Sequence, residues 1–294
     1  MAVDIDALLK EKKDLFNDCL TTYLSSIGVD SGVYRAFAYS LCAGGKRIRP
    51  ILTMLACEAM GGKDRDALPA GLAIEMIHTF SLIHDDLPAL DNDTLRRGRP
   101  TCHAQFGEAT AILAGDALIF QALSLLCSSF YSDEVKVDLC CTISDVCGFR
   151  GLVQGEYEDV MAEGAQLDLA QIEDIYRKKT SRLFELCMYA GGRIVSEDAA
   201  RISSLRTYGT YLGLAYQAID DILDVTTSDT TLGKTSGKDL LQDKATVVKA
   251  IGIDRARAWA VASTEKALKS IEGSDLKKQT ELRDLAQWML KRVM

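Results

Sequence analysis

Charged side chains are concentrated in one segment of this 294-residue chain, residues 81–100. Aspartates come first and arginines follow, among them Asp85, Asp86, Asp91, Arg96, Arg97 and Arg99. A largely apolar run, 72–83, precedes the aspartates and is expected to form a buried helix. Carboxylates at the inner end of such a helix cost free energy unless a cation pairs with them. Mg²⁺ carrying a diphosphate ester would satisfy both the acids and the arginines.

A second acidic cluster contains Asp220, Asp221 and Asp224. On a helix Asp220 and Asp224 stack on one face, and Asp221 lies about 100° round from Asp220. Their neighbours are Ile, Leu, Ala and Tyr, so a solvated face is a poor explanation, whereas capping or isolated ion pairs stay open as alternatives. Two such clusters facing each other could hold several Mg²⁺ ions that bridge one diphosphate. That site would stabilise diphosphate as a leaving group.

The spacing of the first cluster needs a break in the helix. Asp91 is six residues from Asp85, so on a continuous helix its side chain would point elsewhere. Pro88 disfavours a regular helix at this point. A bulge or loop over 87–90 is therefore expected to bring Asp91 back beside Asp85.

The segment Gly44–Pro50 combines two glycines with three cations, Lys46, Arg47 and Arg49, just before an apolar run over 51–60. Loop N–H groups and a helix N-terminus add to the side-chain charge, so this arrangement can bind an anion. A solvated basic turn is the equal alternative.

Glu75 and His78 form a Glu-x-x-His pair on the apolar helix that leads to the first cluster. Two such pairs on separate helices make a di-iron site, but neither of the other two histidines has a Glu three residues before it. Di-iron chemistry is therefore not expected. His78 is either a hydrogen-bonded core residue or a polar group that faces the same anion as the aspartates.

Composition excludes several other classes of function. A net charge of −8 argues against a nucleic-acid binder, and nine cysteines without metal-ligand spacing indicate free thiols in a reducing cytoplasm. The N-terminus is acidic and has no apolar signal core. The longest uncharged run, 117–132, is shorter than the ~20 residues that span a bilayer, so membrane insertion is not expected.

The chain is predicted to be an all-α protein with a single domain over 1–294. All four prolines fall within the first 100 residues, and the rest is rich in good helix formers. Helices are predicted over 4–26, 31–42, 51–60, 67–83, 108–131, 135–161, 168–191, 197–225, 238–252, 254–271 and 274–293.

These motifs closely resemble those of the short-chain trans-isoprenyl diphosphate synthases, and those of the bacterial-type farnesyl diphosphate synthases most of all. The resemblance extends from about Tyr34 to Lys244, and more weakly to the end of the chain. The motifs that carry it are Gly44–Pro50, Asp85–Asp91, Arg96–Thr101, Lys179–Thr180 and Gln217–Asp224.

The resemblance implies a bundle of long helices around a deep central cavity, usually in a homodimer. It implies about three Mg²⁺ ions per active site, with Mn²⁺ as an alternative, and isopentenyl and allylic diphosphates as ligands. Residues implied to bind isopentenyl diphosphate are Gly45, Lys46, Arg49, His78 and Arg97. Residues implied to bind the metal or to support its ligands are Asp85, Asp86, Asp91, Asp220, Asp221 and Asp224. Contacts to the allylic diphosphate are implied for Arg96, Lys179, Thr180, Gln217, Lys234 and Lys244.

The implied reaction ionises the allylic diphosphate, lets the isopentenyl double bond attack the resulting cation, and then passes a proton to the released diphosphate. The residues implied to be catalytic are Asp85, Asp86, Asp91, Lys179, Thr180, Gln217 and Asp220. Thr180 and Gln217 are expected to steady the cation through their oxygens. Arg292 resembles the basic C-terminal residues that close over the site in this family.

The chain departs from the family pattern in three places. Glu156 stands where Gln is frequent, and Asp243 replaces a frequent Gly. After Lys244, Thr246 is followed by two valines in place of Tyr-Pro. None of these residues is a proposed metal ligand. Catalytic activity is therefore still expected, and the departures bear on substrate affinity alone.

Product length in this family often depends on the residue five before the first aspartate, here Phe80. Its ring lies about 7.5 Å along a helix from Asp85 and predicts farnesyl diphosphate, whereas core packing is its other explanation. Ser81 is small and could leave space for the growing chain to pass beside the Phe80 ring.

The alternatives are a geranylgeranyl diphosphate synthase, a terpene cyclase and a non-catalytic subunit of a synthase. A cyclase has no need of an isopentenyl site, and silent subunits commonly lose the aspartates. The presence of the Gly44–Pro50 motif argues against a cyclase, and the presence of both complete aspartate motifs argues against a silent subunit.

Overall fold

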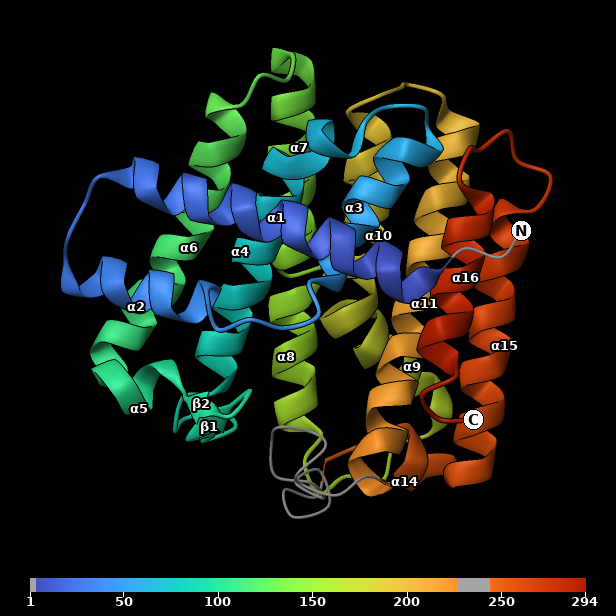
Figure 1. The fold of residues 1–294 in the computed structure, drawn as a ribbon. Helices are drawn as coiled ribbons and strands as arrows, with labels where there is room; N and C mark the ends of the chain where they lie inside the picture. The colour runs from blue at the N-terminus through green and yellow to red at the C-terminus, as the bar shows by residue number, and fades with distance from the viewer. Residues whose placement is uncertain (1–3, 227–243) are drawn as a thin grey trace.

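The computed structural model describes residues 4–226 and 244–294, and within these ranges the chain is a bundle of helices with one short hairpin (Figure 1). The first half contains α1 (Ile5–Ile27), α2 (Gly32–Leu41), α3 (Ile48–Ala59), the 3₁₀ turn η1 (Asp64–Ala67), α4 (Leu68–Asp85), β1 (Leu95–Arg96), β2 (Arg99–Pro100), α5 (Cys102–Phe106) and α6 (Glu108–Ser128). The second half contains α7 (Asp133–Cys147), α8 (Leu152–Met161), α9 (Leu169–Tyr176), the π-helical segment η2 (Arg177–Ser181), α10 (Arg182–Arg193), α11 (Ala199–Thr226), α14 (Val247–Ile251), α15 (Ile253–Ile271) and α16 (Gln279–Leu290).

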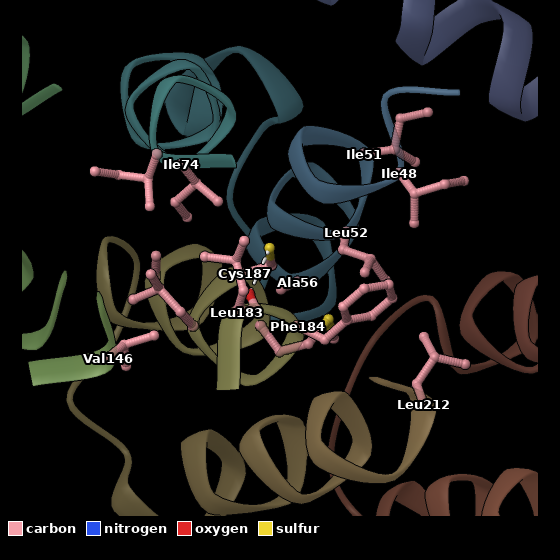
Figure 2. Close-up of a cluster of buried hydrophobic side chains, with 14 of the residues drawn as sticks. Ile48, Ile51, Leu52, Ala56, Ile74, Val146, Leu183, Phe184, Cys187 and Leu212 are labelled. Carbon is pink, nitrogen blue, oxygen red and sulfur yellow. Dashed lines mark hydrogen bonds between the residues drawn. The ribbon is translucent and has the colours of Figure 1, made fainter. Parts of the chain in front are cut away.

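The core lies where α3, α4, α10 and α11 pack together. Figure 2 shows side chains of α3 facing those of α10, with Leu52 beside Phe184 and Leu212 of α11 below them. Helices α3 and α4 are apolar on nearly every face and almost wholly buried, as expected of helices at the centre of a domain. The prediction of an all-α fold is confirmed.

Helix α1 lies across the front of the bundle and ties its two halves together (Figure 1). It begins where the Asp4 carboxylate accepts a hydrogen bond from the Ala7 N–H. Lys12, in the middle of α1, is buried and pairs with Glu58 at 2.8 Å and with Asp64 at 3.5 Å. Helix α2 is capped in the same way, because Ser31 accepts a hydrogen bond from the Tyr34 N–H.

Two predicted helices are wrong. Of the helix predicted over 238–252, residues 244–246 are not helical and α14 covers only Val247–Ile251, while 238–243 lie outside the described residues. The chain breaks the helix predicted over 135–161 into α7 and α8, because glycines at 148 and 151 form the link. A Cβ atom at Gly151 would lie 1.8 Å from the Val146 carbonyl oxygen, so this turn requires glycine. The break redirects α8 toward the end of the bundle where α4 finishes and the β1–β2 hairpin lies (Figure 1).

Two stretches are long and apolar enough to cross a membrane by length and composition, 64–85 and 108–128. Each contains charged residues, which is why a search for uncharged runs does not find them. The first is mostly buried and is the core helix α4, whereas only 33% of α6 is buried. The exposed apolar face of α6 therefore needs another explanation. All nine cysteines are free, as predicted.

Candidate active site

The first aspartate cluster sits where α4 ends. The Asp91 N–H donates to the Asp85 carbonyl at 2.8 Å, and the Asp93 N–H donates to the Asp86 carbonyl at 3.1 Å. Asn92 takes a left-handed conformation with φ 51°, which folds the chain back. The expected return of Asp91 to the neighbourhood of Asp85 is therefore present in the backbone, just after Pro88.

The carboxylates of this cluster have different surroundings. Burial and the nearby carboxylates of Glu156 and Asp91 raise the pKa of Asp85 well above its ordinary value, although Lys179 opposes the shift. Asp86 is buried and accepts hydrogen bonds from the Arg96 guanidinium at 2.6–2.9 Å. Burial raises the pKa of Asp86, and Arg96 offsets part of that rise. Arg96 belongs to β1, so the hairpin missed by sequence reasoning holds this arginine against the cluster.

Lys179 lies in the π-helical segment η2 and is held by two acids of α8. Its ammonium group lies 2.6 Å from Asp159 and 2.8 Å from Glu156. Helix α8 can approach closely because Gly155 has no side chain; a Cβ there would lie 2.4 Å from the Lys179 backbone nitrogen. Burial disfavours the charged lysine, but Asp159, Glu156 and Asp85 outweigh it and hold the pKa of Lys179 well above its ordinary value.

A chain of hydrogen bonds leads from η2 into the second aspartate cluster. The Thr180 hydroxyl donates to the Gln217 carbonyl oxygen at 2.8 Å, and the Gln217 amide donates to Asp221 at 3.0 Å. Asp221 is buried and also accepts from the Tyr176 hydroxyl and, at 3.1 Å, from the Val247 N–H. Asp221 therefore fixes Gln217 and the start of α14.

The other aspartates of α11 have distinct positions. Asp220 is 37% exposed and lies 3.7 Å from Arg292, whose position places the C-terminal segment against this helix. Asp224 is buried. Lys244 donates to Asp91 at 2.8 Å, and so joins the segment beyond α11 to the first cluster. Lys234, predicted to contact the allylic diphosphate, lies outside the described residues, as does the departure at Asp243.

A cavity of about 240 Å³ collects the residues predicted to bind isopentenyl diphosphate. It is lined by Gly45, Lys46, Arg47, Ile48, Arg49, Glu75, His78, Arg97 and Tyr216. Burial lowers the pKa of His78 well below its usual value, and the positive charges of Arg49 and Arg97 add to the shift. Burial and Arg292 lower the pKa of Lys46. Cations that depress one another's pKa in a small cavity indicate a binding site for a multiply charged anion.

A second cavity, about 280 Å³ and mostly apolar, begins at Asp85 and runs along α4 and α8. It is lined by Phe80, Ser81, His84, Asp85, Leu90, Leu152, Val153, Glu156, Tyr157 and Val160. Phe80 is 6% exposed, and its ring makes an edge-to-face contact with His84 at 5.8 Å between ring centroids. The two residues predicted to set product length thus lie in the wall of an apolar cavity beside the first aspartate.

The donor set fits a hard divalent cation that arrives with its ligand. Within 4–226 and 244–294, no group of three or more His, Cys, Asp or Glu side chains is arranged to hold a metal ion. Mg²⁺ commonly takes only one or two carboxylates and completes its shell with phosphate oxygens and water. Burial, together with the carboxylates of Glu156 and Asp91, raises the pKa of Asp85, and a bound cation would offset both effects.

Sequence reasoning missed three contributors to this site. The acidic pair on α8 that holds Lys179 was not linked to this lysine, and Glu156 was noted only as a departure from the family pattern. Tyr176 and Tyr216 lie within apolar helical runs and have no distinguishing spacing. Arg47 was counted among the loop cations, but its guanidinium pairs with Glu75 in the interior.

The chain has relatives of known type. Residues 30–289 match the protein family described as polyprenyl synthetase. The farnesyl diphosphate synthase of Bacillus subtilis (strain 168) is 37% identical over 291 residues, which cover 97% of this chain and 98% of that protein. The large subunit 1 of the chloroplastic heterodimeric geranylgeranyl pyrophosphate synthase of Arabidopsis thaliana is 43% identical over 264 residues, covering 87% of this chain and 71% of that protein.

Solved structures resemble the whole chain. The geranyltransferase of Helicobacter pylori, crystallised with magnesium and isoprenyl diphosphate, superposes with a TM-score of 0.86 at 28% identity. The match covers 99% of this chain and 98% of that one. The arrangement of helices described above is therefore shared along the full length.

The contacts of Asp220 and Asp221 predict different costs when each loses its charge. We expect Asp221→Asn to lower the free energy of unfolding by about 2–3 kcal/mol, because an amide would present a donor to groups that are already donating. Asp220→Asn should change it by less than about 1 kcal/mol, since this carboxylate is part-exposed and solvent screens its ion pair with Arg292. Urea unfolding followed by circular dichroism in EDTA measures both, and equal costs would contradict the assignment.

Proposed function

Because the chain belongs to the polyprenyl synthetase family and is a trans-prenyltransferase, we propose that it condenses isopentenyl diphosphate with dimethylallyl and then geranyl diphosphate, giving farnesyl diphosphate and diphosphate. The observation that carries the proposal is the pair of cavities on either side of the aspartates. One is basic and lies beside Tyr216, one helical turn from Asp220. The other is apolar and begins at Asp85. The diphosphate of the isopentenyl substrate needs the basic environment, and the growing hydrocarbon chain needs the apolar one.

We assign the basic cavity to isopentenyl diphosphate. Lys46, Arg49 and Arg97 supply positive charge there, and the neutral His78 ring supplies a further hydrogen bond. Binding in a cavity separate from the aspartates leaves the double bond of this substrate free to point toward the allylic carbon.

The allylic diphosphate binds between the two aspartate clusters in this proposal. Asp85, Asp91 and Asp220 would hold Mg²⁺ with it, and the bound ions would neutralise charge on the departing diphosphate. Lys179 and Lys244 are positioned to turn from their carboxylate partners toward the diphosphate oxygens. Arg96 stays paired with Asp86 and adds positive charge from the hairpin.

Breaking the allylic C–O bond leaves a carbocation whose positive charge needs nearby oxygens. Asp221 orients the Gln217 amide so that its carbonyl oxygen and the Thr180 hydroxyl meet on the same side. The π-electrons of isopentenyl diphosphate form the new C–C bond, and loss of one proton, which the released diphosphate can accept, restores a double bond. The atoms balance as one longer allylic diphosphate plus one diphosphate.

A direct assay tests this function and the two competing classes. With dimethylallyl and isopentenyl diphosphates and Mg²⁺, we expect diphosphate release and a prenyl product, and EDTA should abolish both because the carboxylates need the metal. Diphosphate release without isopentenyl diphosphate would instead identify a cyclase. Absence of release under all conditions would identify a silent subunit.

Product length depends on the end wall of the apolar cavity. Relatives include both farnesyl and geranylgeranyl diphosphate synthases, so overall identity does not decide between them. Phe80 supports the fifteen-carbon product, because its buried ring lies in the cavity wall a little more than one helical turn before Asp85. A chain that grows from the aspartates along α4 would meet this ring.

We expect Phe80→Ala to shift the main product from fifteen to twenty carbons, because it removes the ring from the cavity wall. Phe37→Ala is the matched control: Phe37 is as deeply buried but lies on α2, outside the lining of this cavity. Both variants should lose about 3–5 kcal/mol of stability. Chromatography of radiolabelled products decides, and unchanged length in Phe80→Ala would remove its gating role.

We also propose that the protein is a cytoplasmic homodimer. Helix α6 exposes Leu113 and Phe120, with Phe120 72% exposed, and α8 exposes Val153, Tyr157 and Met161. A large exposed apolar face such as that of α6 marks an interaction site. A second copy of the same face would cover it and explain why α6 is apolar although mostly unburied.

Phe120→Asp is expected to convert the dimer to a monomer, because it would bury an unpaired charge in the interface. Val29→Asp, at a residue 54% exposed between α1 and α2, is the control and should remain dimeric. Light scattering after size exclusion reads the mass. A Phe120→Asp protein that keeps its dimer mass would rule out this face.

A further inference from the structure

Arg47, the middle cation of the Gly44–Pro50 loop, is buried in the wall of the basic cavity and is held by partners from the protein interior. Its guanidinium donates to Glu75 Oε1 at 2.7 Å and to the Leu41 carbonyl oxygen at 2.7 Å. Both side chains of the ion pair are 2–3% exposed. An arginine so fully buried and paired is costly to place and strongly held once it is satisfied.

Two contacts with α1 complete the surroundings of Arg47. Its Nε lies 3.4 Å from Asn17 Oδ1, and its guanidinium carbon lies 5.5 Å from the centre of the Phe16 ring. The side chain is thus fixed by α1, by the end of α2 and by α4. The backbone of Arg47 is left-handed, with φ 53° and ψ 34°, a conformation that a residue with a Cβ adopts only when its surroundings impose it.

The left-handed backbone shapes the binding loop. Gly44 and Gly45 also have positive φ, at 81° and 114°, so three of the four residues 44–47 turn in the same unusual sense. Lys46 and Arg49, on either side of Arg47, line the basic cavity. Glu75 is one turn before His78 on α4, so the same ion pair ties the loop to the helix that carries the cavity's histidine.

We propose that the buried Arg47–Glu75 ion pair is a positioning pair for isopentenyl diphosphate. It holds the loop in its left-handed turn and so places Lys46 and Arg49 opposite His78, with the Arg47 guanidinium committed to Glu75 and the Leu41 carbonyl oxygen. This inference rests on the proposed assignment of the basic cavity, and it predicts a loss of affinity for this substrate in particular.

The molecule contains a matched ion pair that separates positioning from simple stabilisation. Lys12 of α1 is equally buried and pairs with Glu58 at the other end of α3, but neither residue lines the basic cavity. If Arg47 only stabilises the fold, Arg47→Met and Lys12→Met should behave alike. If it positions the loop, only Arg47→Met should weaken isopentenyl diphosphate binding.

The experiment titrates the full-length variants with isopentenyl diphosphate in a calorimeter, without allylic substrate so that no turnover occurs. Arg47→Met should raise the Kd by about 10- to 100-fold, the loss expected for one misaligned charge-assisted contact, while Lys12→Met stays within about 2-fold. The KM for geranyl diphosphate should remain within about 2-fold in both variants. Arg47→Lys, which keeps the charge but cannot make the forked contacts, should give an intermediate Kd.

The remaining outcomes are equally informative. Equal shifts in Kd for Arg47→Met and Lys12→Met, or no shift for either, overturn the inference. If Arg47→Met does not fold, Glu75→Gln of similar size takes its place, and an unchanged Kd there overturns the inference as well. Lys46→Ala tests the premise separately: if it leaves the Kd unchanged, the cavity assignment fails, whereas a weakened Lys46→Ala with an unaffected Arg47→Met refutes only the positioning role.

Discussion

Repulsion among carboxylates at one end of the helical bundle is the constraint on which the rest of the structure depends. Burial removes the water that would screen Asp85, and the nearby carboxylates of Glu156 and Asp91 add to burial in raising the pKa of Asp85. The protein answers with cations from distant parts of the chain: Arg96 from the hairpin, Lys179 from the π-helical segment, and Lys244 from the segment that follows α11. The fold thus brings cations from separate parts of the chain next to these carboxylates.

The helices that deliver these groups owe their positions to ordinary packing. Helices α3, α4, α10 and α11 bury their apolar faces against one another (Figure 2), and this core fixes where α4 and α11 end. Several departures from regular helix lie in the candidate site. The π-helical turn contains Lys179 and Thr180. Three of the four non-glycine residues with a left-handed backbone among the described residues, Arg47, Asn92 and Arg97, lie in loops of the site, whereas the fourth, Lys278, precedes α16.

The sequence was informative where residue type and local spacing determine structure. The apolar periodicity predicted most helices to within a few residues, and Pro88 correctly indicated the return of the chain at Asp91. The break between α7 and α8 was missed because the two glycines interrupt a pattern that is otherwise periodic on both sides. Long-range partners could not be predicted at all: nothing in the spacing of Glu156 and Asp159 says that they meet Lys179, or that Glu75 meets Arg47. Such pairs depend on how separate helices pack, which one sequence does not specify.

The carboxylates that hold Lys179 and Lys244 have a consequence for the end of the catalytic cycle. When diphosphate dissociates from a buried lysine, the ammonium group is normally left without a counter-ion. The free-energy cost of that unpaired charge would slow the release of diphosphate. Here each lysine has a resident anion within reach, Asp159 and Glu156 for one and Asp91 for the other. In the proposed mechanism, product exit would be an exchange of counter-ions in which the protein's own acids replace the diphosphate. Because Glu156 is an acid, it would favour the release of diphosphate from Lys179 in that mechanism.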